Sequence, residues 1–185
     1  MKLITLNSHS LVEPDYENKL KLFAEAVLRE RPDVVALQEV NQSMGEPAVE
    51  QERLGALGFV ECRERGTESK VEAGARGAVI PVRADNHAYR LAGLLAEGGA
   101  PYFWTWVPAK IGYGRYDEGT ALFSRLPVAQ TGWIYLTGSR DYKNWKTRKA
   151  LEMILDFHEK RCRFFSLHMG WWKDGDEPFA GQWER

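Results

Sequence analysis

The chain has 185 residues, of which 44% are hydrophobic and 28% charged, and its formal net charge is −1. This length and apolar content are enough for a sizeable core, so we expect a single folded domain over residues 1–185 rather than a disordered chain. A pI near 6.4 argues against tight nonspecific binding to nucleic acid through a broad basic surface, although a local basic groove would fit.

The sequence shows no signal for secretion or membrane insertion. The first apolar run is interrupted by the polar residues 7–10, which makes it too short for a signal peptide. No segment approaches the apolar length that spans a bilayer. The two cysteines, Cys62 and Cys162, lack the spacing of a metal site and are typical of a reducing compartment. We therefore expect a cytoplasmic protein.

The first forty residues predict a strand, a helix and a second strand. Residues 2–6 are typical of a strand that ends on Asn7, and residues 34–37 form an apolar run, typical of a strand covered on both faces, that leads to Glu39. Helical spacing between them relates Leu20, Phe23, Ala24, Val27 and Leu28, and Pro32 ends that helix. Parallel neighbouring strands would place Asn7 and Glu39 at one carboxyl edge, where ligand groups collect in α/β sheets.

The middle of the chain predicts shorter elements. We expect a helix over residues 50–57, a short strand at residues 59–60 and a solvated polar loop or hairpin over residues 61–76. Apolar spacing then predicts a helix over residues 86–95, with Asp85 or Asn86 as its N-cap and two glycines, 98 and 99, as its stop.

The second half of the chain is rich in strand signals. They predict strands over residues 102–107, 119–124, 133–137, 151–157 and 162–167, with a hairpin turn at residues 158–161. Alternation places Tyr102, Trp104 and Trp106 on one face, either in the core or as a surface on which flat ligands stack. Early helices followed by antiparallel-looking strands indicate a mixed α/β (α+β) sandwich.

Three polar residues stand at the ends of predicted strands: Asn7, Glu39 and His168. An amide, a carboxylate and an imidazole suit phosphoryl chemistry, in which a hard cation such as Mg²⁺ takes oxygen ligands and a histidine handles a proton or a phosphate oxygen. The structural alternatives are a Glu39 that merely meets water and a His168 that is a satisfied core histidine. Their recurrence at strand ends favours a site.

Four motifs carry a resemblance to a known family: LNS at 6–8, LQEVN at 37–41, YDEGTALFSRLPV at 116–128 and SLHMGWW at 166–172. In this order they resemble the endonuclease/exonuclease/phosphatase family, the metal-dependent phosphoesterases that include pancreatic-type deoxyribonuclease and the neutral sphingomyelinases. The resemblance implies a deoxyribonuclease-like layered α/β sandwich with a mixed sheet. It also implies hydrolysis of a phosphodiester or phosphomonoester by metal-activated water with histidine assistance.

The same resemblance implies roles for individual residues. Glu39 would bind Mg²⁺ or Mn²⁺ with Asn7 beside it, and His168 would be the catalytic histidine. Glu118 would orient His168 through the far nitrogen of its ring. Arg148 would lie near the substrate phosphate, a task that suits its planar charged group. A turn-flanking surface acid and a surface arginine are the alternatives for Glu118 and Arg148.

Aromatic residues near this edge are candidates for the substrate pocket. We expect Trp171, which with Trp172 follows His168, and Tyr116 to contact the substrate. Further candidates, among which the sequence does not choose, are His9, Asn86, His87, Tyr113, Tyr142 and Trp145. Nucleic acid, nucleotide, inositol phosphate and lipid headgroup are not distinguished as substrates. The near-neutral charge favours a small or flexible phosphoester over long duplex DNA.

Two motifs that relatives place further along are absent here, a Gly-Asp-Phe-Asn strand end and a terminal Ser-Asp-His. The acidic residues 174–177 lack a preceding apolar strand and do not replace them. We therefore expect a C-terminally truncated domain whose first sheet lacks the second sheet of its relatives and exposes an apolar face. The alternative function is a catalytically inactive fragment or a binding module on the same scaffold.

Overall fold

The structure is a computed structural model that describes residues 1–66, 80–171 and 173–185. In chain order its elements are β1 (Leu3–Asn7), the 3-10 helix η1 (Ser10–Val12), α1 (Tyr16–Glu30), β2 (Val34–Ser43), α2 (Gln51–Ala56), α3 (His87–Glu97), β3 (Phe103–Gly112), β4 (Tyr116–Ser124), β5 (Val128–Tyr135), β6 (Lys149–Phe157), β7 (Lys160–Leu167) and α4 (Phe179–Trp183). Most of the predicted polar loop at 61–76, and Trp172, lie outside the described residues.

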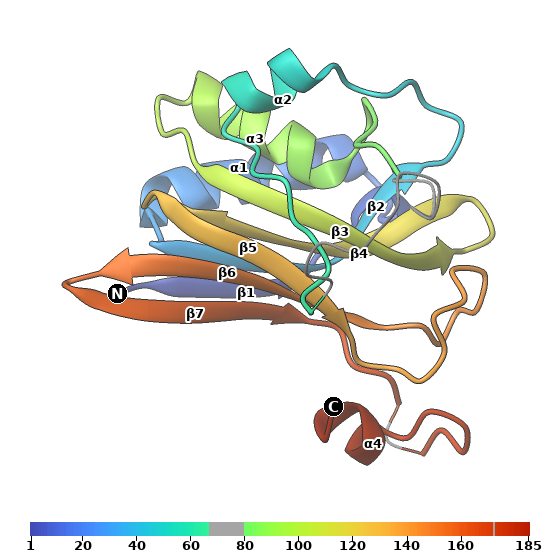
Figure 1. Cartoon of the computed structure of the whole chain (residues 1–185). Helices are drawn as coiled ribbons and strands as arrows, with labels where there is room; N and C mark the ends of the chain where they lie inside the picture. The colour runs from blue at the N-terminus through green and yellow to red at the C-terminus, as the bar shows by residue number, and fades with distance from the viewer. Residues whose placement is uncertain (67–79, 172) are drawn as a thin grey trace.

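The elements form layers, as Figure 1 shows. Helices α1, α2 and α3 cover one face of a four-stranded sheet with the order β1-β2-β4-β3, and a three-stranded sheet β5-β6-β7 lies on the other side. β1 pairs with β2 in parallel, whereas β4 pairs antiparallel with both β2 and β3. The predicted mixed-sheet α/β sandwich is therefore confirmed.

Strand β2 runs through the middle of the sandwich. Its residues Val35 and Leu37 belong to the core formed with the helices, and Val34 and Ala36 belong to the core between the two sheets. Burial of a Val or Leu side chain contributes about 1.5–3 kcal/mol relative to exposure. A strand anchored in two cores explains the apolar run without alternation, and it gives the residues that follow a rigid support.

The expectation that the first sheet lacks a second sheet is wrong. Leu151, Met153 and Leu155 of β6 share one face, as predicted, and pack against Leu122 of β4 in the core between the sheets. The last strands form this sheet from local hairpins. The turn between β6 and β7 needs only residues 158 and 159, both with positive φ (46° and 62°), as in the tight turns that suit the twist of a hairpin.

The aromatic face of β3 belongs to the core and is not a stacking surface. Tyr102, Trp104 and Trp106 are 3%, 0% and 3% exposed, and each donates a hydrogen bond to a backbone carbonyl of a neighbouring segment. The predicted strand at residues 59–60 is reduced to one isolated bridge between Phe59 and Trp104. Trp104 therefore holds the sheet to the segment that follows α2, whereas Tyr102 binds Pro32 and Trp106 binds Val40 of β2.

The predicted helices are confirmed, with small shifts at their ends. The side chain of Asn86, not that of Asp85, caps α3 by accepting from the backbone N–H groups of Ala88 and Tyr89. Strands β3 and β4 are longer than predicted, because polar residues typical of a loop continue their ladder. In the part of the chain that the structure describes, no helix has the length and apolar character needed to cross a membrane.

Candidate active site

Glu39 occupies a β-bulge in β2. The pairing with β4 shifts between Gln38 and Val40, and Glu39 has a φ of 53°, a left-handed conformation that is strained for a residue other than glycine. The bulge leaves Oε2 of Glu39 buried and, among the described residues, without a hydrogen-bond partner. Strain and an unsatisfied buried carboxylate oxygen at one position are typical of a binding site.

The polar residues that end β1 hold this bulge in place. Asn7 donates from Nδ2 to Oε1 of Glu39 (3.0 Å), and Ser8 donates from Oγ to the carbonyl oxygen of Glu39 (3.2 Å). Ser10 accepts from the backbone N–H of Asn41 (2.9 Å). The prediction that Asn7 and Glu39 share one edge is confirmed. The polar residues 7–10, which interrupt the first apolar run, support the bulge in β2.

His168 reaches the same edge from the second sheet. It directly follows β7, and Ser166 of that strand donates to the carbonyl oxygen of Leu37 in β2 (2.8 Å), which links the two sheets. As a result Nε2 of His168 lies 3.6 Å from Oε1 of Glu39. Burial, followed by the positive charge of Arg148, lowers the pKa of His168, which favours the neutral form of its imidazole.

Arg148 and Glu118 are both buried, at 7% and 4% exposure, so the surface alternatives for these two residues are wrong. Arg148 donates from Nη1 to the backbone carbonyl oxygen of Trp145 (2.7 Å), and burial lowers its pKa. Glu118 lies 2.9 Å from Nζ of Lys110. Glu118 lies near the site but forms its ion pair with Lys110, so its orienting role toward His168 stays a prediction.

Lys110 was missed by the sequence reading. Our predicted strand stopped at residue 107, which left Lys110 in a loop, whereas β3 continues to Gly112 past a second bulge between Pro108 and Lys110. That bulge brings Lys110 opposite Glu118. The opposite charges of Lys110 and Glu118 would have indicated their pairing, but only if the register of the two strands had been known.

Comparison with known proteins identifies the family of the chain. The model of the Endonuclease/Exonuclease/phosphatase family matches residues 4–151. The chain belongs to the endonuclease/exonuclease/phosphatase family. This family is generally hydrolytic and commonly uses divalent metals, which supports a phosphoesterase-type or nuclease-like function in general. No curated protein matches the chain in sequence.

Two solved structures of endonuclease/exonuclease/phosphatase proteins share the fold. A family protein from Leptotrichia buccalis C-1013-b matches with a TM-score of 0.80 at 22% identity, over 100% of this chain and 59% of its own. The protein from Beutenbergia cavernae DSM 12333 matches with a TM-score of 0.56 at 18% identity, over 91% of this chain and 38% of its own. The chain thus spans less than two thirds of either neighbour.

The oxygen atoms of Glu39 and Asn7 fit one part of a site for a hard cation. Among the described residues the buried Oε2 of Glu39 has no hydrogen-bond partner, whereas Asn7 donates from Nδ2 to Oε1 of Glu39 and its amide oxygen accepts from the backbone N–H of His9. Carboxylate and amide oxygens are the donors that Mg²⁺ and Mn²⁺ take. Within residues 1–66, 80–171 and 173–185, no group of three or more His, Cys, Asp and Glu side chains is placed to hold a metal ion.

The aromatic residues predicted to contact substrate differ in exposure. Trp171 is 76% exposed on the segment after His168, whereas Tyr116 is 6% exposed with the guanidinium of Arg115 4.7 Å from its ring centroid. Tyr113 and Trp145 are exposed at 58% and 61%. The side chains of Trp171, Tyr113 and Trp145 are therefore accessible to a ligand, whereas the side chain of Tyr116 is buried.

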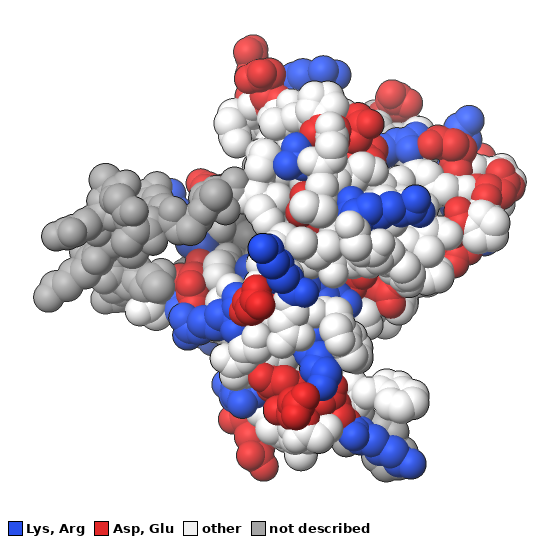
Figure 2. Space-filling view, turned by 90° about the vertical axis from the view of Figure 1, so that its right-hand side faces the viewer, with Lys and Arg blue, Asp and Glu red and all other residues white. Residues whose placement is uncertain are grey.

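One face of the molecule carries the β3–β4 turn and the loop between β5 and β6, and side chains of both charges are mixed on it. Figure 2 views this face, which is the right-hand side of Figure 1, and shows Lys and Arg interspersed with Asp and Glu. Several of these charges are paired, such as Lys146 with Asp174 (2.9 Å) and Asp176 (2.8 Å). On this face the two signs of charge are therefore mixed.

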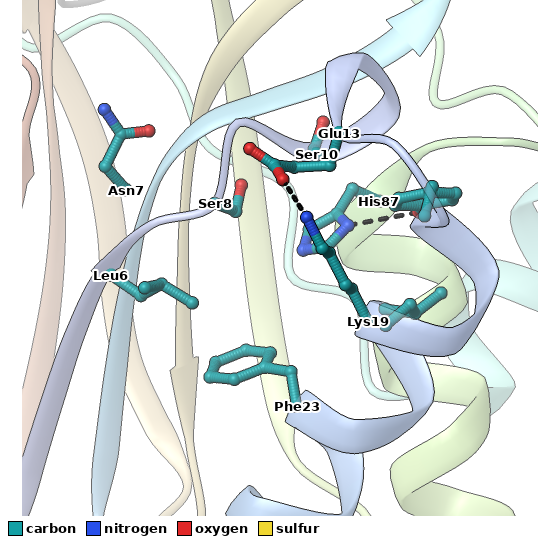
Figure 3. A pocket seen from close by; sticks show the side chains of 10 residues that line it. Leu6, Asn7, Ser8, Ser10, Glu13, Lys19, Phe23 and His87 are labelled. Atoms are coloured by element: carbon teal, nitrogen blue, oxygen red, sulfur yellow. Dashed lines mark hydrogen bonds and ion pairs between the residues drawn. The ribbon is translucent and has the colours of Figure 1, made fainter.

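A cavity of about 210 Å³ adjoins Asn7 on the helix side of the sheet. Figure 3 shows its lining, with Phe23 and Leu6 on one side and the imidazole of His87 at the back. His87 is 4% exposed, and its Nδ1 lies 3.1 Å from the hydroxyl of Tyr16. Burial, followed by the charge of Arg90, lowers the pKa of His87 to about 4.

The buried imidazole of His87 predicts a loss of stability in acid. Its pKa is about 4 when folded and about 6.5 when unfolded, so the unfolded chain takes up the proton first as the pH falls. The stability present above pH 6.5 is lost on acidification, by about 2 kcal/mol at pH 5. In urea unfolding, the free energy of unfolding should therefore fall less between pH 7 and pH 5 for His87→Gln than for the wild type. His158→Asn, in the exposed β6–β7 turn, is the matched control, and an unchanged drop in His87→Gln would contradict the assignment.

Proposed function

We propose that the chain carries the metal-binding and histidine side of the active edge of a phosphoesterase that hydrolyses a phosphodiester or a phosphomonoester. One observation carries the proposal. A strained bulge presents the carboxylate of Glu39, with one buried oxygen that no described residue hydrogen-bonds, 3.6 Å from the imidazole of His168, which reaches it from the other sheet. Core packing alone gives no reason for this arrangement.

Each residue at the edge would have a task. Glu39 and Asn7 would hold Mg²⁺ or Mn²⁺, and the bound cation would neutralise phosphate charge and lower the pKa of water. The imidazole of His168, whose pKa is lowered by burial and by Arg148, would accept a proton at Nε2 or contact a phosphate oxygen. Arg148 adds fixed positive charge, and Trp171 with Tyr116 would contact the rest of the substrate.

Hydrolysis of two generic substrates tests this proposal. Bis(p-nitrophenyl) phosphate and p-nitrophenyl phosphate would be assayed with the full chain in Mn²⁺, in Mg²⁺ and in EDTA. We expect turnover with either metal, loss of turnover in EDTA and recovery when metal is restored. His168→Asn should lower kcat by about 100-fold or more, because it removes the proton-handling group.

The control for His168→Asn is His158→Asn, a histidine substitution in the exposed turn between β6 and β7. It should leave turnover unchanged. Turnover that persists in EDTA would overturn the metal dependence. Equal kcat values for His168→Asn and the wild type would remove His168 from the mechanism.

A binding module on the same scaffold is the second candidate. It is favoured by the observation that the described residues bring no three metal-ligating side chains together. Isothermal titration calorimetry with Mn²⁺ separates the two candidates. Mn²⁺ binding together with turnover supports the phosphoesterase, whereas neither binding nor turnover supports the binding module.

A further inference from the structure

A second histidine, His9, lies beside the carboxylate of Glu39. Nε2 of His9 lies 3.8 Å from Oε2 of Glu39, whereas Nε2 of His168 lies 3.6 Å from Oε1. The oxygen toward His9 is the buried one that has no hydrogen-bond partner among the described residues. The two oxygens of the Glu39 carboxylate therefore each have one imidazole as a neighbour.

The imidazole of His9 is held at both nitrogens. Its Nδ1 lies 2.7 Å from Oε1 of Glu13, and its Nε2 lies 2.9 Å from the hydroxyl of Tyr113. Lys19 bonds the other oxygen of Glu13 and keeps that carboxylate ionised. A carboxylate beside Nδ1 favours the tautomer with the ring proton there, and in that tautomer Nε2 accepts from the Tyr113 hydroxyl. The ring orientation is thus set by two groups from different parts of the chain.

The backbone at both ends of this hydrogen-bonded chain is strained. His9 has a φ of 50° and Tyr113 a φ of 52°, both in the left-handed region that favours glycine. The backbone N–H of His9 also donates to Oδ1 of Asn7 (3.3 Å), whose Nδ2 bonds Glu39. His9 therefore contacts the Glu39 carboxylate directly through its ring and indirectly through Asn7. Such strain persists only where the surroundings over-determine it.

We propose that His9 is a positioning residue of this site, which fixes the Glu39 carboxylate and the Tyr113 hydroxyl while Glu13 fixes the tautomer of its ring. The inference rests on the proposed function, because it gives Glu39 its role as a metal ligand. His9 acts through Glu39 and Asn7 and is not itself a ligand. Groups that orient metal ligands change metal affinity by about 10–100-fold when they are replaced.

Mn²⁺ affinity of the full chain is the first test. His9→Asn is the informative variant, because asparagine tolerates the left-handed backbone but cannot reach both Glu13 and Tyr113. We expect Mn²⁺ to bind at least about 10-fold more weakly to His9→Asn by calorimetry. Glu25→Gln, an exposed acid on α1, is the matched control and should leave the affinity unchanged. Unchanged affinity in His9→Asn would overturn the proposal.

Two readouts without metal make the test independent of the proposed function. The ¹⁵N signals of the His9 ring should show the proton on Nδ1, and Glu13→Gln should convert them to a tautomer mixture. The shifts in melting temperature caused by His9→Asn and Glu39→Gln should be non-additive in the double variant. If the wild type binds no Mn²⁺, the proposed function fails, and these readouts still decide on His9. A proton on Nε2, or additive shifts, would overturn the positioning role.

Discussion

Gly119→Ala is expected to lower the free energy of unfolding by about 3 kcal/mol or more. Gly119 of β4 pairs with Val40 of β2 on one side and with Pro108 of β3 on the other, next to the bulge in each strand. A Cβ atom at Gly119 would lie 2.0 Å from the carbonyl oxygen of Val107, which is backbone and cannot turn away. Either the sheet separates there or a bulge is lost, and with it the geometry of Glu39 or Lys110.

Urea unfolding of the Gly119→Ala chain measures this loss. The matched control is Gly93→Ala in the middle of α3, where a Cβ atom would meet nothing within 4 Å. Because alanine is the better helix former, Gly93→Ala should raise the free energy of unfolding by about 0.5–1 kcal/mol. Equal stability of Gly119→Ala and the wild type would show that the sheet does not need the close approach of these strands.

Local patterns in the sequence predicted the first half of the fold well. The apolar run before Glu39 and the helical stripe before Pro32 report burial directly, and both are confirmed by β2 and α1. The shared edge of Asn7 and Glu39 followed from the parallel pairing of two neighbouring strands. These features depend on contacts between segments that are close in sequence.

The rest of the site depends on register and on packing between sheets, which local patterns do not encode. The bulge at Glu39 is held by side-chain hydrogen bonds of Ser8 and Asn7, which the composition of β2 does not report. The second sheet was missed because the same strand signals suit either one sheet or two. Lys110 was missed because a bulge extends β3 through residues that are typical of a loop.

Glu39→Gln is expected to weaken Mn²⁺ binding and to lower kcat/KM by about 100-fold or more, equivalent to about 2.7 kcal/mol. The substitution keeps the size of the side chain and an oxygen that can accept from Asn7 Nδ2, but it removes the negative charge that a cation requires. Among the described residues the buried Oε2 has no hydrogen-bond partner, so the substitution breaks no hydrogen bond of the fold. The melting temperature should therefore stay the same or rise while affinity and turnover fall.

This opposite response of stability and activity distinguishes two roles of Glu39, that of a metal ligand and that of an acid that only supports the fold. A structural Glu39 that only supports the bulge would lose stability on substitution, and activity would fall with it. The matched substitution Glu25→Gln removes the same charge from the exposed face of α1 and should change neither quantity. Retained Mn²⁺ affinity in Glu39→Gln would contradict the ligand role. A lower melting temperature together with lower turnover would mean that the strained bulge serves the sheet and not a metal ion.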